Sequence, residues 1–258
     1  MTIDKIMRLA PVIPVLVVEE HLDPVALAEA LVEGGLPVIE VTLRTPNALA
    51  AIMAMAPVIP VLVLDGGHDP AELAVTLVAA GLPVIEVTLR TPDALAAIRA
   101  MAAVSGAIVG AGTVLDEAQM ARAIDAGAGF IVSPGLTNPL LLAARDTGIP
   151  FLPGIATASD IMRGLDAGLD RFKFFPAEAA GGMAALKALA APFANVRFCP
   201  TGGITAASAP QWLALDAVAC VGGSWIVPKR ATLEEIRALA RDAAKLASQP
   251  KPAPRRSL

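Results

Sequence analysis

The chain of 258 residues is poor in the side chains on which metal centres and disulfide frameworks depend. It contains two cysteines, two histidines and no tyrosine. Cys199 and Cys220 both lie in apolar, strand-like runs, which indicates buried reduced thiols, because an oxidised framework uses more cysteines. His21 and His68 fall in turn-like segments. With so few candidate ligands, we expect no metal site.

Charged residues are also scarce, at 17% of the chain against a usual value of about a quarter. The chain is apolar, yet no run of about 18 uncharged apolar residues occurs, which argues against a transmembrane helix. The first residues include Asp4 and lack the apolar core of a signal peptide. The net charge of −4 argues against a nucleic-acid surface. We therefore expect a cytoplasmic protein with no nucleic-acid or membrane partner.

A tandem repeat occupies the first part of the chain. Residues 11–56 recur as residues 57–102, and 33 of the 46 positions are identical. Each copy predicts a strand, a helix, a second strand and a second helix. Asp23-Pro24 and Asp69-Pro70 are typical of a helix N-terminus, with a capping residue followed by proline. The high identity indicates a recent or deliberate duplication.

After the repeat, short apolar strands alternate with helices rich in alanine and leucine, which predicts βα units and a parallel sheet. The predicted strands are 12–17, 37–43, 58–63, 83–89, 107–110, 129–133, 150–153, 171–174, 196–200 and 217–221. The predicted helices are 24–32, 46–55, 70–78, 92–101, 117–124, 138–147, 158–167, 183–190, 207–213 and 233–247. This makes ten βα units, and removing one copy leaves the eight that close a (β/α)8 TIM barrel. The predicted fold is therefore α/β, a TIM barrel with a duplicated N-terminal βαβα unit.

Three parts of the chain follow from this interpretation. Residues 1–56 hold an N-terminal helix and the first copy, as an appendage or a swapped unit, because its exposed sheet edges favour pairing with another chain. Residues 57–247 form the barrel, since the second copy runs directly into the next predicted strand. Residues 248–258 form a disordered tail rich in proline and arginine. The alternatives are a barrel built with the first copy, and a ten-stranded barrel, whose interior these side chains would not fill.

Lys173 stands in an apolar strand among Phe172, Phe174 and Phe175. Apolar surroundings remove hydration from a charged lysine and so favour the neutral amine that attacks a carbonyl carbon to form a Schiff base. In the alternative interpretation, the lysine reaches solvent or pairs with Glu178.

A glutamate stands inside the second strand of each copy, as Glu40 and as Glu86. A carboxylate on a buried strand must be paired or protonated. Arg44 or Arg90, at the end of the same strand, offers a structural partner. In the functional interpretation, the glutamate is a general acid and base at the barrel mouth and the arginine contacts an anionic substrate.

Two glycine pairs follow the last two predicted strands, where barrels commonly bind phosphate with backbone N–H groups. They are Gly202-Gly203, preceded by Thr201, and Gly222-Gly223, followed by Ser224. A single glycine pair is usually a tight turn, but two such pairs at these positions favour a phosphate site.

The sequence around these residues resembles the 2-keto-3-deoxy-6-phosphogluconate (KDPG) aldolase family. Six motifs carry the resemblance: Glu-Val-Thr-Leu-Arg-Thr in each copy, 110–115, 133–137, 172–178, 197–204 and 222–225. The resemblance covers nearly the whole chain apart from one surplus copy. It implies a class I, metal-free aldolase that needs no cofactor, on a (β/α)8 barrel, usually as a homotrimer.

The resemblance also implies roles for individual residues. Lys173 would form the Schiff base with the keto carbon of KDPG, and Glu86, or alternatively Glu40, would transfer protons. The products would be pyruvate and glyceraldehyde 3-phosphate. The carboxylate end of pyruvate would be lined by Arg90 (or Arg44), Thr113 and Pro134, with Phe175 near the imine. The phosphate would be held by Gly202, Gly203, Gly223 and Ser224.

Three other functions remain open at this point. A sister activity in the family is the cleavage of 4-hydroxy-2-oxoglutarate, which carries no phosphate. A phosphate-binding isomerase or epimerase would use the glycine loops without imine chemistry. The duplicated barrel could also be a scaffold in which catalysis is impaired or lost.

Overall fold

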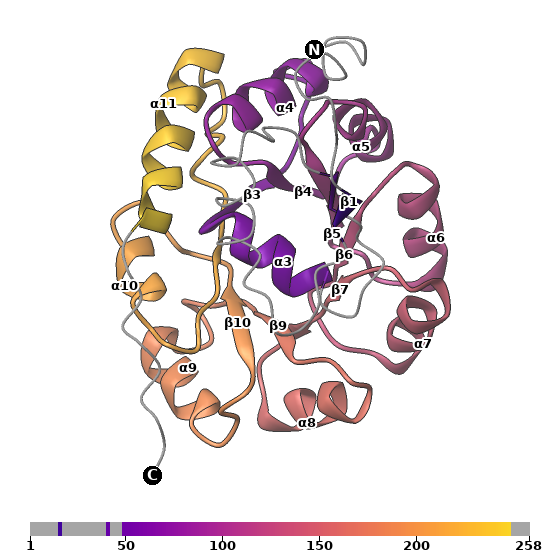
Figure 1. Ribbon diagram of the computed structural model, residues 1–258, viewed down its shortest axis with the longest axis vertical. Helices are drawn as coiled ribbons and strands as arrows, with labels where there is room; N and C mark the ends of the chain where they lie inside the picture. The colour runs from indigo at the N-terminus through magenta and orange to yellow at the C-terminus, as the bar shows by residue number, and fades with distance from the viewer. Residues whose placement is uncertain (1–14, 17–39, 42–47, 249–258) are drawn as a thin grey trace.

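The computed structural model describes residues 15–16, 40–41 and 48–248 (Figure 1). Most of the predicted first copy, including the predicted helix 24–32, lies outside the described residues, as do Arg44 and residues 249–258 of the tail. The described part is an α/β fold built on a curled parallel sheet, with helices around its outside.

The curled sheet consists of two hydrogen-bonded sets of parallel strands. One set has the order β11-β3-β4-β5-β6-β7 and the other has the order β10-β9-β8. Their bounds are β3 Val58–Leu62, β4 Val84–Thr88, β5 Ile108–Gly112, β6 Phe130–Val132, β7 Phe151–Leu152, β8 Gly154–Ile155, β9 Arg171–Phe174, β10 Arg197–Pro200 and β11 Val221–Gly223.

The two sets join at both sides, which gives the sheet the form of a TIM-like barrel. Only Pro153 separates β7 from β8, and its carbonyl accepts a hydrogen bond from the Lys173 N–H on β9. On the other side, single bridges link Phe198 to Val218 and Thr201 to Gly222. The strand positions predicted from residue 58 onward agree with this order.

The helices from α4 onward pack on the outer surface of the sheet. Their bounds are α4 Pro70–Ala79, α5 Ala94–Ala102, α6 Glu117–Asp125, α7 Asn138–Thr147, α8 Ala158–Asp166, α9 Gly182–Ala190, α10 Ala209–Leu213 and α11 Leu233–Ala244, followed by the 3-10 turn η1 Lys245–Ser248. Asp69 caps α4 as the sequence predicts, because its carboxylate accepts from the N–H of Glu72. Among the described residues, no helix is both long and apolar enough to cross a membrane.

One helix, α3 (Ala48–Met55), packs inside the barrel core instead of on its outside. Ile52 and Met53 are buried in a cluster with interior residues of the strands, among them Phe130 and Cys199. Figure 1 shows α3 lying across the centre of the ring of strands. The sequence analysis assigned this helix to the first part of the chain, whereas its side chains pack in the barrel core.

The difference between α3 and its repeat partner α5 has a simple physical cause. The two sequences differ at one position in the run they share: Met53 of α3 corresponds to Arg99 of α5. Met53 is 1% exposed inside the barrel, whereas Arg99 is exposed on the outer surface. A charged side chain would be costly at the position of Met53. Only α3 is therefore apolar enough to be buried on several sides.

The two short strands of the first copy form a separate parallel pair. β1 (Val15–Leu16) pairs with β2 (Glu40–Val41), with Val15 opposite Glu40. The second copy has the equivalent register, with Val61 opposite Glu86. Within the described residues the curled sheet has eight strand positions, counting β7 and β8 as one, so ten βα units in one sheet are not supported.

The burial of α3 predicts that it stabilises the barrel. Replacing Ile52, which is fully buried, by alanine should lower the free energy of unfolding by about 2–5 kcal/mol, because a cavity remains among rigid strands. Met55→Ala is the matched control, since Met55 is 40% exposed, and should change stability by no more than about 0.5 kcal/mol. Urea unfolding measures both variants. Equal stability of Ile52→Ala and the unaltered protein would contradict the interior position of α3.

Candidate active site

A cavity of about 160 Å³ opens at the carboxyl ends of the parallel strands. Strand ends of this kind form the active-site face of TIM-like barrels, because the βα loops converge there. The lining residues are Val61, Val63, Glu86, Thr88, Arg90, Thr113, Pro134, Lys173, Phe175, Thr201, Gly202, Gly203, Ile204, Gly222 and Ser224. Every residue of the second copy and of the later chain that the sequence analysis proposed for the site is among them, except Gly223.

The centre of the cavity is a buried ion pair between Lys173 of β9 and Glu86 of β4. The Nζ atom of Lys173 lies 3.0 Å from Oε1 and 3.3 Å from Oε2 of Glu86. The lysine and glutamate side chains are 7% and 5% exposed. The ring of Phe175 lies beside the amine, with its centroid 5.5 Å from Nζ. Burial of both charges strengthens their attraction and fixes the amine in one place.

The ion pair bears on the alternative interpretation of Lys173. Its nearly buried amine pairs with Glu86 and not with Glu178, whose Oε1 accepts a hydrogen bond from Nε1 of Trp212 at 3.0 Å. Arg90, the expected structural partner of Glu86, lies instead at the exposed rim of the cavity.

The side chains of the first copy that the structure describes, in residues 48–56, do not line this cavity. Glu40 lies on β2, which pairs with β1, whereas Glu86 lies on β4 between β3 and β5 of the curled sheet. Arg44 lies outside the described residues. The structure therefore places the glutamate of the second copy against Lys173.

Gly112, at the end of β5, provides the space that the Glu86 side chain occupies. A Cβ atom built on Gly112 would fall 2.7 Å from Cγ and 2.8 Å from Cδ of Glu86, closer than any real contact. Gly112 also lies opposite Thr88 in the register of β4 and β5. A glycine in the run 110–113 thus has a defined purpose, which is to let a long acidic side chain turn toward Lys173.

The two glycine pairs lie on the opposite side of the cavity from β5. Gly202 and Gly203 have φ angles of +105° and +83°, which favour glycine. Gly222 packs against the side chain of Thr201, and Gly223 packs against the ring of Trp225. The position of Gly223 against Trp225 explains why it does not line the cavity.

The sequence analysis missed four residues that line the cavity: Val61, Val63, Thr88 and Ile204. Three of them could have been found from strand periodicity, because alternate residues of a strand point to the same face. Thr88 is two residues from Glu86, and Val61 and Val63 occupy alternate positions of the predicted strand 58–63. Ile204 follows the Gly202-Gly203 turn, whose path the sequence does not define.

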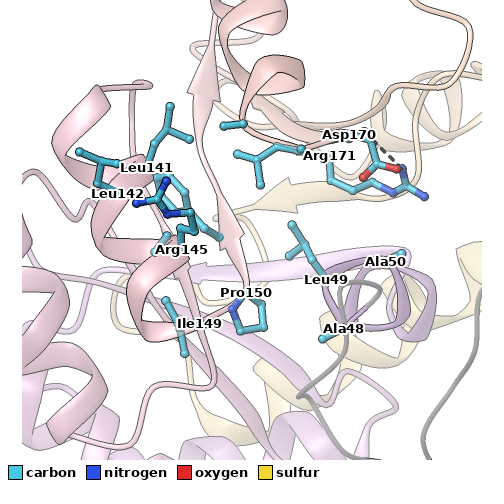
Figure 2. Close-up of a pocket in the computed structure, with 16 residues that line it drawn as sticks. Ala48, Leu49, Ala50, Leu141, Leu142, Arg145, Ile149, Pro150, Asp170 and Arg171 are labelled. Carbon is cyan, nitrogen blue, oxygen red and sulfur yellow. Dashed lines mark hydrogen bonds and ion pairs between the residues drawn. The ribbon is translucent and has the colours of Figure 1, made fainter.

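A second cavity, of about 280 Å³, lies at the opposite end of the barrel. Figure 2 shows Ala48 and Leu49 of α3 facing Pro150, with the Asp170–Arg171 ion pair at one side. Leu141, Leu142 and Arg145 of α7 complete the labelled wall. Among the described residues, its lining includes no lysine and none of the residues proposed for catalysis. Lys173 and Glu86 lie in the smaller cavity.

The family model described as "Aldolase: KDPG and KHG aldolase" matches residues 3–57 and 49–240. The chain belongs to this aldolase family. Its second matched segment contains every described strand of the curled sheet and both members of the buried ion pair.

Comparison with individual proteins agrees with the family. The KHG/KDPG aldolase of Escherichia coli strain K12 is 52% identical over 244 residues, which cover 93% of each chain. The crystal structure of the 2-keto-3-deoxy-6-phosphogluconate aldolase of Zymomonas mobilis ZM4 with 3-phosphoglycerate superimposes with a TM-score of 0.76. It is 52% identical and covers 78% of this chain and 97% of that one.

The structure of a third relative contains a covalent intermediate. The structure of KDPG aldolase from Legionella pneumophila holds pyruvate as a covalent carbinolamine intermediate. It is 44% identical, has a TM-score of 0.69, and covers 79% of this chain and 96% of that one.

The close contact at Gly112 predicts a sharp response to one added methyl group. Gly112→Ala should push the Glu86 carboxylate away from Lys173 and lower the free energy of unfolding by about 1–3 kcal/mol, because the tightly packed interior cannot absorb the methyl. Gly67→Ala is the control, since a methyl there meets only Asp65 at an ordinary 3.6 Å. Urea unfolding and crystal structures of both variants test this. A Gly112→Ala structure that keeps the Lys173–Glu86 contact would contradict it.

Proposed function

We propose that this protein is a class I aldolase that cleaves KDPG to pyruvate and glyceraldehyde 3-phosphate through a Schiff base on Lys173. The observation that carries the proposal is the amine of Lys173, held 3.0 Å from the Glu86 carboxylate at the carboxyl ends of the strands. An amine that attacks a carbonyl must lose a proton, and here the acceptor is already in place. The carbinolamine held by the Legionella relative supports the same chemistry.

Glu86 serves each proton transfer of the proposed reaction. The Nζ atom attacks the keto carbon C2, and protons move through Glu86 as the carbinolamine forms and loses water. The resulting iminium is the electron sink for cleavage: the C4 hydroxyl loses its proton, the C3–C4 bond breaks, and its electrons form an enamine. Protonation of the enamine at C3 and hydrolysis then release pyruvate and free the lysine.

The remaining residues of the cavity would bind the two ends of the substrate. Arg90, Thr113 and Pro134 are proposed for the carboxylate end, and Phe175 for packing against the imine. The glycine turns, with Thr201 and Ser224, are proposed for the phosphate, which their N–H and hydroxyl groups suit. The positive φ of Gly202 and Gly203 and the bound 3-phosphoglycerate of the Zymomonas relative support this assignment.

Cleavage of 4-hydroxy-2-oxoglutarate is a second candidate activity. The family description names both KDPG and KHG aldolase, and so does the name of the Escherichia coli relative. The same Schiff base on Lys173 would cleave either substrate, because the reacting atoms are the same. The glycine turns favour the phosphorylated one.

We also propose that residues 11–56 are a tandem copy of the first two βα units, of which α3 packs in the barrel core, supported by the 33 identities in 46 positions. The barrel would then take Glu86 and leave Glu40 without a partner in catalysis. A homotrimer remains a prediction from the resemblance, and a cytoplasmic location remains a prediction from the composition.

Reductive trapping tests the Schiff base directly. With pyruvate and sodium borohydride, the protein should gain one covalent adduct per chain, located at Lys173 by peptide mass spectrometry. Lys173→Arg should gain none, because a guanidinium does not form the imine, whereas Lys187→Arg, a substitution on outer helix α9, should be trapped normally. An unaltered protein that gains no adduct would point to an isomerase or epimerase instead.

Substitution of the two repeated glutamates tests which copy serves catalysis. Glu86→Gln should lower kcat for KDPG cleavage by about 10²–10⁴-fold, the usual contribution of a general acid and base. Glu40→Gln should leave kcat unchanged, since β2 pairs with β1, whereas β4 is the strand that brings its glutamate to Lys173. Steady-state kinetics of both variants measure this, and the opposite pattern would assign the site to the first copy.

A further inference from the structure

We propose that Glu178 and Trp212 are positioning residues: their hydrogen bond holds the Gly202-Gly203 turn in the shape that binds the substrate phosphate. Neither residue lines the cavity, so both act through the turn. This inference rests on the proposed aldolase function and explains how that site would distinguish a phosphorylated substrate from an unphosphorylated one.

The first observation is the hydrogen bond itself. Trp212 of α10 is completely buried, and its indole Nε1 donates to Oε1 of Glu178 at 3.0 Å. A buried indole N–H without an acceptor would cost stability, so this contact fixes both side chains. The Trp212 ring also packs against Phe174 on β9, with centroids 6.4 Å apart. Through Trp212 and Phe174, the carboxylate of Glu178 is thereby connected by non-covalent contacts to β9, the strand that carries Lys173.

The second observation is the contact of Glu178 with the turn. A Cβ atom on Gly203 would fall 2.7 Å from Cγ and 2.8 Å from Cβ of Glu178. The aliphatic part of Glu178 therefore fills the space beside Gly203 and supports its backbone, which has a φ of +83°. The residue at position 203 must be glycine because the Glu178 side chain lies where its own side chain would be.

Two backbone hydrogen bonds set the direction in which the turn presents its polar groups. The N–H of Ala177 donates to the carbonyl of Thr201 at 2.8 Å, and the N–H of Glu178 donates to the carbonyl of Gly202 at 3.1 Å. These bonds direct the two carbonyls toward residues 177–178. Among the described residues, the N–H of Gly203 donates to no backbone carbonyl, which leaves it available for an anion.

The negative charge of Glu178 cannot be what binds phosphate, since like charges repel. Two properties of the Glu178 side chain support the turn: its length fills the space beside Gly203, and one oxygen accepts the hydrogen bond from Trp212. Glutamine keeps both and removes the charge, whereas alanine removes both. The pair Glu178→Gln and Glu178→Ala therefore separates positioning from electrostatics.

The test compares phosphorylated and unphosphorylated substrates. Glu178→Ala should raise KM for KDPG by about tenfold, the effect of losing one hydrogen bond from the turn to the charged phosphate of the substrate. The kcat should stay within about twofold. Its kinetics with 4-hydroxy-2-oxoglutarate should stay unchanged. Glu178→Gln should restore KM for KDPG, and the exposed Glu117→Ala on α6 is the matched control. Equal losses on both substrates, or no rescue by glutamine, would overturn the proposal.

Trp212→Phe provides an independent test that keeps an aromatic ring in the core. It removes the N–H donor together with part of the indole ring, so it should raise KM for KDPG without affecting 4-hydroxy-2-oxoglutarate. Adding Glu178→Ala to it should cost less than the sum of the single effects, because both act through one hydrogen bond. Additive effects would contradict the coupling. If Glu178→Ala does not fold, Trp212→Phe alone still tests the positioning role of this hydrogen bond.

Direct binding of inorganic phosphate separates this inference from the proposed function. Calorimetric titration needs no turnover, and it should show weaker phosphate binding for Glu178→Ala and Trp212→Phe than for the unaltered protein and Glu178→Gln. An unaltered protein that binds phosphate but cleaves neither substrate would refute the aldolase function alone. An active aldolase whose phosphate binding is the same in all four proteins would refute the positioning role alone.

Discussion

The buried pair of Lys173 and Glu86 is the interaction on which the rest of the site depends. The two residues are 87 positions apart, and the curled sheet brings β9 and β4 to face each other across its interior. Burying two charges is costly unless each finds its partner, so the pair tolerates few other arrangements of these strands. Gly112 gives the glutamate room, and Phe175 covers the amine beside it. Gly112 and Phe175 thus both support the Lys173–Glu86 contact.

The two ends of the barrel have different roles: one end is packed with apolar side chains that stabilise the fold, and the other holds the groups proposed to react. At the amino ends of the strands, α3 fills the interior with apolar side chains and contributes no charge. At the carboxyl ends, polar residues and glycine turns surround the amine of Lys173. Because the interior is filled from one end, the reacting groups are open to solvent only from the other. A substrate must therefore approach Lys173 through the ring of βα loops, where the glycine turns lie.

Most of the barrel could be predicted because its signals are local. Apolar strands between helices predicted the sheet order, and the aromatic surroundings of Lys173 predicted a buried amine. The path of the Gly202-Gly203 turn could not be predicted, since it depends on Glu178 and on a tryptophan 34 positions away. The interior position of α3 was missed for a different reason: its sequence equally suits an outer βα helix, and the deciding difference is one residue, Met53.

The repeat shows how context chooses between nearly identical sequences. A helix before β3 must fill the barrel interior, and a helix after β4 must face solvent on one side. Met53 satisfies the first condition and Arg99 the second. If the first copy supplied the barrel strands, α3 would follow β2 as an outer helix, Met53 would face solvent, and β3 and β4 would have to leave the neighbours they now pair with. The position of α3 in the barrel core thus fits the pairing of β3 with β4, the strand that brings Glu86 to Lys173.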